Sequence, residues 1–217
     1  MLFHRPKTSL PKPEEALPGR AERWFHLRDE HVVLKTPVVT DETNIPAGFE
    51  VAIFGLGCFW GAEEIYWQTP GVWSTSVGYA GGHTPHPSYE EVCSGQTGHT
   101  EAVRVVFDPA TVSYADLVKT FFEVHDPTQG MRQGNDIGTQ YRSALYTLSK
   151  EQEATARELT KVYGDELARR GLGEITTEVR PAPTYYYAED AHQQYLAKNP
   201  FGYRCHANTG VKFPATP

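Results

Sequence analysis

The stretch AIFGLGCFWGAEEIYW, residues 52–67, decides the fold because glycines join two apolar segments within it. The apolar run at 50–57 ends in glycines and predicts a short buried strand. Residues 58–68 carry apolar side chains at helical spacing and Pro70 ends the pattern, so a helix is predicted there. Glycine permits the tight turn that leads from the strand to the helix. The cysteine of this stretch, Cys58, is therefore predicted in the first turn of a helix.

Strand and helix patterns continue from this junction to about residue 200. Further strands are predicted at 72–82, 100–109, 143–149 and 174–183, and further helices at 89–93, 113–126 and 150–171, while the stretch 184–200 is predicted to end as a helix running to Pro200. Residues 126–142 are predicted as a polar, Gly-rich loop and residues 201–217 as coil. The proline-rich residues 1–48 predict an extended arm that lies over the domain or is partly mobile. This order predicts an α+β fold, a two-layer sandwich with a mixed sheet and a ferredoxin-like core.

Composition narrows the class of protein. The chain has 217 residues, of which 39% are hydrophobic and 22% charged, as in one globular domain with or without an arm. Its net charge of −7 argues against nucleic-acid binding, which needs clustered Lys and Arg. No secretory signal or membrane-length apolar run is recognised in the sequence. With three cysteines, at least one thiol cannot form a disulfide within the chain. This favours a reducing compartment, so a soluble cytoplasmic protein is predicted.

Cys58 is a candidate nucleophile because of its place in the chain. A helix N-terminus favours the thiolate and lowers the pKa of a cysteine. The alternative is a small buried residue at a crowded junction between strand and helix. The sequence C-F-W-G is not C-x-x-C, which excludes a dithiol at this position. A cysteine hydrolase or acyl transferase with a histidine base stays open, since His99, His125 and His192 are among nine histidines. No metal-ligand spacing is present.

Four blocks of sequence are similar to one known family. They are GCFWGAEE, GYAGGHTPHPSYEEVCSGQTGHTEAV, HDPTQGMRQGNDIGTQYRSALY and YYAEDAHQQYLAKNP. In this order they resemble peptide methionine sulfoxide reductase, A type, from about residue 49 to 203. The resemblance implies an α+β sandwich that reduces methionine S-sulfoxide, free or in proteins, with no metal or organic cofactor. It also implies that residues 49–217 are the catalytic domain and that about 199–217 form a resolving tail.

The resemblance implies a role for each site residue. Cys58 attacks the sulfoxide sulfur, and Glu101 protonates the sulfoxide oxygen. To supply that proton Glu101 must be neutral at working pH, so its pKa is expected to be raised by burial. The polar residues that hold the sulfoxide oxygen are implied to be Tyr89, Tyr141 and Asp136. The wall that receives the S-methyl group of the substrate is implied to be Phe59 and Trp60, and Tyr195 is a further polar residue of the pocket.

The sulfenic acid left on Cys58 must be resolved by a second thiol. The family commonly carries this cysteine directly after a Gly-Tyr pair, whereas here Arg204 follows Tyr203 and Cys205 comes one place later. We expect a Cys58–Cys205 disulfide that thioredoxin reduces, with Cys93 as the competing thiol. The enzyme is expected to be a monomer that binds neither nucleic acid nor membrane. A second rival function is a non-catalytic module that binds oxidised methionine through aromatic side chains.

Overall fold

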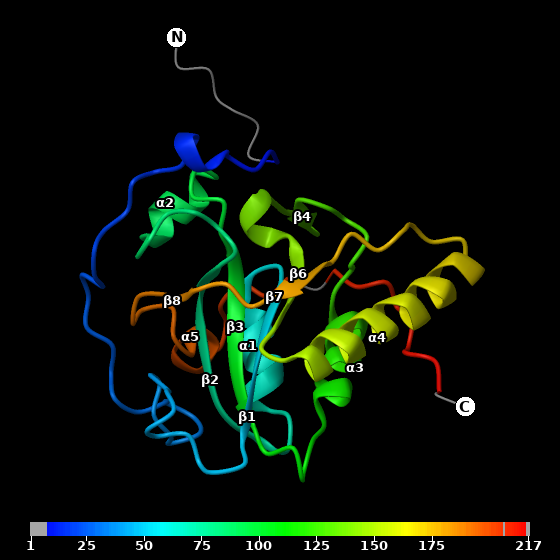
Figure 1. Cartoon of the computed structure of the whole chain (residues 1–217), viewed down its shortest axis with the longest axis horizontal. Helices are drawn as coiled ribbons and strands as arrows, with labels where there is room; N and C mark the ends of the chain where they lie inside the picture. The colour runs from blue at the N-terminus through cyan, green and yellow to red at the C-terminus, as the bar shows by residue number, and fades with distance from the viewer. Residues whose placement is uncertain (1–7, 206, 216–217) are drawn as a thin grey trace.

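A six-stranded sheet forms the centre of the computed structural model, which describes residues 8–205 and 207–215 (Figure 1). The strands are β1 (Glu50–Leu56), β2 (Val72–Ala80), β3 (Thr100–Phe107), β6 (Ser143–Thr147), β7 (Glu178–Pro181) and β8 (Tyr185–Tyr187). Their order is β7-β6-β1-β3-β2-β8. Strands β6 and β7 pair in parallel, whereas the other neighbours pair antiparallel. The expected α+β fold with a mixed sheet is therefore confirmed.

The helices follow the predicted pattern closely. They are α1 (Phe59–Trp67), α2 (Tyr89–Cys93), α3 (Tyr114–Val124), α4 (Lys150–Arg169) and α5 (Tyr195–Lys198), with two 3-10 turns, η1 (Pro13–Glu15) and η2 (Thr139–Tyr141). The hydroxyls of Ser113 and Ser149 cap α3 and α4 by accepting backbone N–H bonds. Within the described part of the chain, no helix is long and apolar enough to cross a membrane.

The sequence analysis missed two short features. The helix expected at the end of 184–200 is present as the short α5, but residues 185–187 before it form β8, which pairs with β2. Gly78 of β2 makes this pairing possible, since a Cβ there would lie 2.4 Å from the carbonyl oxygen of Tyr186. The loop expected over 126–142 contains a small hairpin, β4 (Arg132–Gln133) and β5 (Asp136–Ile137). Gly134 permits that turn with a φ of 58°.

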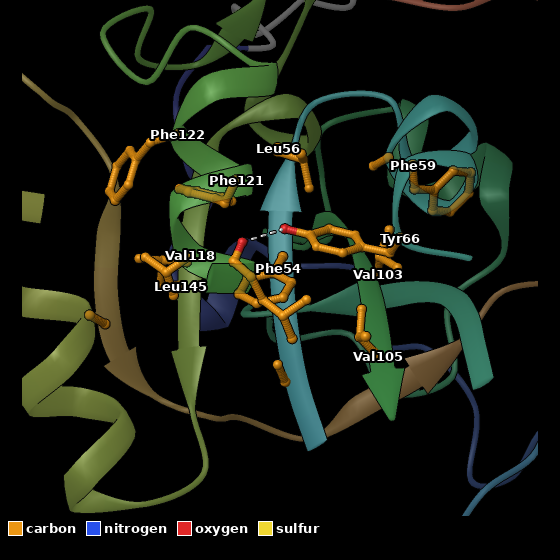
Figure 2. Close-up of a cluster of buried hydrophobic side chains, with 14 of the residues drawn as sticks. Phe54, Leu56, Phe59, Tyr66, Val103, Val105, Val118, Phe121, Phe122 and Leu145 are labelled. Atoms are coloured by element: carbon orange, nitrogen blue, oxygen red, sulfur yellow. Dashed lines mark hydrogen bonds between the residues drawn. The ribbon is translucent and has the colours of Figure 1, made fainter. Parts of the chain in front are cut away.

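Helices α1, α3 and α4 pack on one face of the sheet, where the main hydrophobic core lies (Figure 2). Phe54 of β1 stacks on Tyr66 of α1, with 4.9 Å between ring centroids, and lies 5.9 Å from Phe121 of α3. The Tyr66 hydroxyl donates to the Leu117 carbonyl at 3.3 Å. Ile53, the residue before Phe54 in β1, points to a smaller hydrophobic cluster on the opposite face of the sheet. This packing fixes the β1–α1 junction that carries Cys58.

Residues 8–48 run along the surface of the domain and are tied to it by polar contacts. Arg28 donates three hydrogen bonds to the Asp190 carboxylate, one from its backbone N–H at 3.0 Å and two from its guanidinium at 2.9 and 2.5 Å. His31 is fully buried, and its Nε2 lies 2.9 Å from the Thr75 hydroxyl, which donates to Glu63 of α1 at 3.0 Å. Gln194 donates to the same carboxylate from its backbone and its side chain, both at 2.8 Å. A buried polar network thus joins the arm, β2, α1 and the segment before α5.

Candidate active site around Cys58

Cys58 is the N-terminal cap of α1, as the sequence predicts. Gly57 before it has a φ of 95°, and a Cβ there would lie 2.7 Å from Gln133, so only glycine fits. The Cys58 side chain is 8% exposed. Burial raises the pKa of its thiol well above the usual value and the charge of Glu101 adds to this, although the N–H groups of Trp60 and Gly61 oppose it. The expected lowering of this pKa is wrong because desolvation outweighs the helix terminus.

Glu101 on β3 is buried beside the same helix terminus. Its Oε2 accepts the backbone N–H of Phe59 at 2.9 Å, and its side chain is 1% exposed. Burial chiefly raises the pKa of Glu101, to about 8; the hydrogen bond from the Phe59 N–H opposes this rise and the charge of Asp136 adds to it. The expected rise by burial is confirmed. At neutral pH the carboxyl is therefore mostly protonated and can supply a proton next to Cys58.

The three predicted polar residues gather near Glu101 from different segments. Tyr89 opens α2, Tyr141 closes η2, and Asp136 lies in β5. Burial raises the pKa of both tyrosines, and the negative charge of Glu101 raises each further. Burial also raises the pKa of Asp136. The hydroxyls therefore stay protonated and act as hydrogen-bond donors at neutral pH.

The predicted wall forms an aromatic stack. Trp60 lies flat on Tyr195, with 3.9 Å between ring centroids and 16° between planes. Phe59 is 1% exposed and packs in the core beneath, next to Trp60 and Tyr79. Tyr195, expected as a polar pocket residue, contributes its ring to this stack. The wall thus presents the partly exposed Trp60 and Tyr195 to a ligand.

Sequence reasoning gave no role in the substrate pocket to three residues of this site. His192 accepts the indole N–H of Trp60 at 3.2 Å, and its ring lies 4.3 Å from that of Tyr89. Glu189 accepts the backbone N–H of Tyr89 at 2.8 Å and thereby holds α2 in place. Tyr203 donates to Asp136 at 3.1 Å. The first two lie in the matched block YYAEDAHQQY, whose density of polar and aromatic side chains was the available signal.

Cys205 and Cys58 face one cavity of about 210 Å³. The Cys205 thiol donates to the Gln133 carbonyl at 3.5 Å. All three cysteines are among the described residues, and no disulfide joins any of them. Cys93 ends α2, where it is half-buried and hydrogen-bonded to Tyr89. A larger groove of about 990 Å³, between residues 40–51 and the start of α4, holds none of the predicted site residues.

Two of the three candidate histidines, His125 and His99, give no support to a cysteine hydrolase. His125 lines the same cavity as Cys58, but its ring nitrogens contact the Phe121 carbonyl at 2.5 Å and the Ser143 hydroxyl at 2.8 Å. His99 is likewise bonded through both nitrogens. Burial lowers the pKa of each to about 4. Neither can take the proton of Cys58 without breaking an existing bond. Across residues 8–205 and 207–215, no three acidic, His or Cys side chains converge as metal ligands.

Comparisons with known proteins agree on one family. The family model for peptide methionine sulfoxide reductase matches residues 50–216. The chain is 56% identical to the peptide methionine sulfoxide reductase MsrA of Rhodospirillum centenum over 98% of its own length and 95% of that protein. It is 58% identical to MsrA of Azotobacter vinelandii over 95% and 94%. The structure of methionine sulfoxide reductase A of Corynebacterium diphtheriae superposes with a TM-score of 0.84, at 48% identity, covering 95% of this chain and 100% of that one.

Proposed function

The chain belongs to the peptide methionine sulfoxide reductase family, A type, and we propose from this premise that Cys58, Glu101 and Cys205 carry its reaction. The enzyme is an oxidoreductase that reduces methionine sulfoxide. The observation that carries the assignment of residues is the pairing of Cys58 with a buried, largely neutral Glu101 at one helix terminus.

The first step transfers the sulfoxide oxygen to Cys58. Trp60 receives the S-methyl group, with Phe59 packed behind it, while Tyr89, Tyr141 and Asp136 surround the oxygen. The neutral Glu101 donates its proton to the oxygen as the Cys58 sulfur attacks the sulfoxide sulfur, and the proton released by the thiol restores the carboxyl. The S–O bond of the substrate breaks, the thioether of methionine leaves, and the oxygen stays on Cys58 as a sulfenic acid. The two electrons come from the Cys58 sulfur.

The second step restores the thiol. Cys205 attacks the sulfenic acid, water leaves, and a Cys58–Cys205 disulfide forms. The dithiol of thioredoxin then reduces that disulfide. The shared cavity supports Cys205 over Cys93 as the attacking thiol, since Cys58 and Cys205 both line it.

The proposal extends to the setting of the reaction. We propose that both free and protein-bound methionine S-sulfoxide are substrates, and that the enzyme acts in the cytoplasm, where thiols stay reduced. A monomer suffices, because every proposed group comes from one chain. Residues 49–217 are the proposed catalytic domain, with 1–48 as an arm. The antiparallel order β6-β1-β3-β2, with α1 and α3 as connections, supports a ferredoxin-like core.

A Cys205→Ser variant tests this proposal. With thioredoxin as reductant it should form about one methionine per enzyme and then stall, since the sulfenic acid has no resolving thiol. Mass spectrometry after one equivalent of a methyl sulfoxide should find oxygen on Cys58 in the variant and a Cys58–Cys205 bridge in the wild type. Continued cycling at full rate would point to Cys93 or to direct reduction of the sulfenic acid. A non-catalytic binding module would show no Cys58 oxidation at all.

A further inference from the structure

A salt bridge connects the resolving tail to the helix that begins at Cys58. We propose that the ion pair between Arg204 and Glu64 is a latch that positions Cys205 for its attack on Cys58. The inference rests on the proposed disulfide step and names two positioning residues for it. Neither side chain is assigned contact with the substrate.

The geometry of the pair is bidentate. Glu64 lies in α1, six residues after Cys58. Its two carboxylate oxygens accept hydrogen bonds from Arg204 Nε at 2.7 Å and Nη2 at 2.8 Å. The third guanidinium nitrogen, Nη1, donates to the carbonyls of Pro200 at 2.9 Å and Gly202 at 3.3 Å. One side chain therefore fixes both the turn at 200–202 and the distance of that turn from α1.

The neighbouring residue, Cys205, has a second anchor on the hairpin β4–β5. Its thiol donates to the Gln133 carbonyl, and a Cβ on Gly134 would lie 3.1 Å from its sulfur. The cavity of about 210 Å³ lies between these anchors and is lined by Glu64, Arg204, Cys58 and Cys205. The latch thus forms one wall of the space that the Cys205 sulfur must cross.

The pair differs from an ordinary surface ion pair. Its side chains are 28% and 21% exposed, so solvent screens them only in part. Without it, residues 200–205 would sample more conformations, and the effective concentration of Cys205 at Cys58 would fall. A bidentate charge-assisted pair shifts a conformational equilibrium by about tenfold. The first step should be unaffected, because it needs only Cys58 and the substrate pocket.

Glu64→Gln separates the two steps. In single-turnover experiments, we expect methionine to form within about twofold of the wild-type rate. Formation of the Cys58–Cys205 disulfide should slow about tenfold, so the sulfenic acid accumulates and can be trapped with dimedone and weighed by mass spectrometry. The matched control is Glu153→Gln, which removes a similar Arg–Glu pair with Arg157 on α4, away from the site. It should leave both rates unchanged.

The reversed pair, Glu64→Arg with Arg204→Glu, should form the disulfide faster than Glu64→Gln but more slowly than wild type, since it rebuilds the ion pair without the bonds to the Pro200 and Gly202 carbonyls. The latch is refuted if Glu64→Gln forms the disulfide at the wild-type rate, or if both steps slow equally, which would indicate general damage to α1. A wild-type enzyme that forms no Cys58–Cys205 disulfide would instead overturn the proposed function. The two failures are therefore distinguishable.

Discussion

Replacing Glu101 by glutamine tests the chemical core of the proposed mechanism. Glu101 has a pKa of about 8, so at pH 7 about ten carboxyls are protonated for each one ionised. Glutamine keeps the size and the acceptor for the Phe59 N–H but cannot release a proton. Loss of a positioned general acid typically costs about 10²- to 10⁴-fold in rate. We expect the first-turnover formation of methionine to fall by this factor.

The same substitution should change the Cys58 thiol in the opposite sense. At the high pH at which the Cys58 thiol loses its proton, Glu101 is already ionised, and its negative charge raises the pKa of Cys58. Glutamine carries no charge, so the pKa of Cys58 should fall, while burial still holds it above the usual value.

The assay therefore has two readouts that move apart. Quenched-flow measurement of methionine release reports catalysis, and the pH dependence of iodoacetamide alkylation of Cys58 reports the thiol. We expect Glu101→Gln to reduce more slowly and to alkylate at lower pH than the wild type. Reduction within about tenfold of wild type, or an unchanged alkylation profile, would refute the role of Glu101. Cys58→Ser provides the background for alkylation.

Three further predictions concern pH, packing and substrate binding. The pKa of Glu101 is raised from 4.5 to about 8 in the folded state, so the native protein binds a proton that the unfolded chain releases. Thermal melting should therefore show the stability of the wild type falling relative to Glu101→Gln as the pH rises from about 4.5 to 8. A stability difference that stays constant over this range would contradict the prediction. The buried Tyr114 hydroxyl has no hydrogen-bond partner among the described residues, so Tyr114→Phe should match or exceed wild-type stability by up to about 1 kcal/mol in urea, and a clear loss would be the opposing result. Trp60→Leu removes the ring stacked on Tyr195, so the KM for free methionine sulfoxide should rise about tenfold with a smaller change in kcat. An unchanged KM would show that Trp60 does not contact the substrate.

The strand–helix junction was predictable because its signals are local. An apolar run, a glycine and a helical repeat lie within 16 residues, and the structure places Cys58 at the helix cap as expected. Residues 185–187 show the reverse. Three consecutive tyrosines fit a helix or a strand, and only the distant Gly78 gives them a partner strand. Pairing between remote segments decided the outcome, and no local pattern contains it.

Burial explains the remaining differences at the site. The helix terminus at Cys58 is a sequence-level signal, but the desolvation that raises the thiol pKa depends on how the tail and β3 pack around it. From alternation alone Glu101 would face solvent. It is buried because β3 is a central strand, flanked by β1 and β2. The choice of Glu101 came from the resemblance to a family, and the spacing of residues could not have supplied it.

The buried carboxylate of Glu63 has a consequence for any shortened form of this protein. The match to the family model begins at residue 50, yet His31 completes the polar chain that runs through Thr75 to Glu63. A fragment starting at residue 50 would open the interior of α1 to water one turn away from the nucleophile. It would also lose the hydrogen bond from the Val32 N–H to the side chain of Gln194, the residue before Tyr195. We therefore expect the smallest autonomous folding unit to begin well before the sequence boundary of the family.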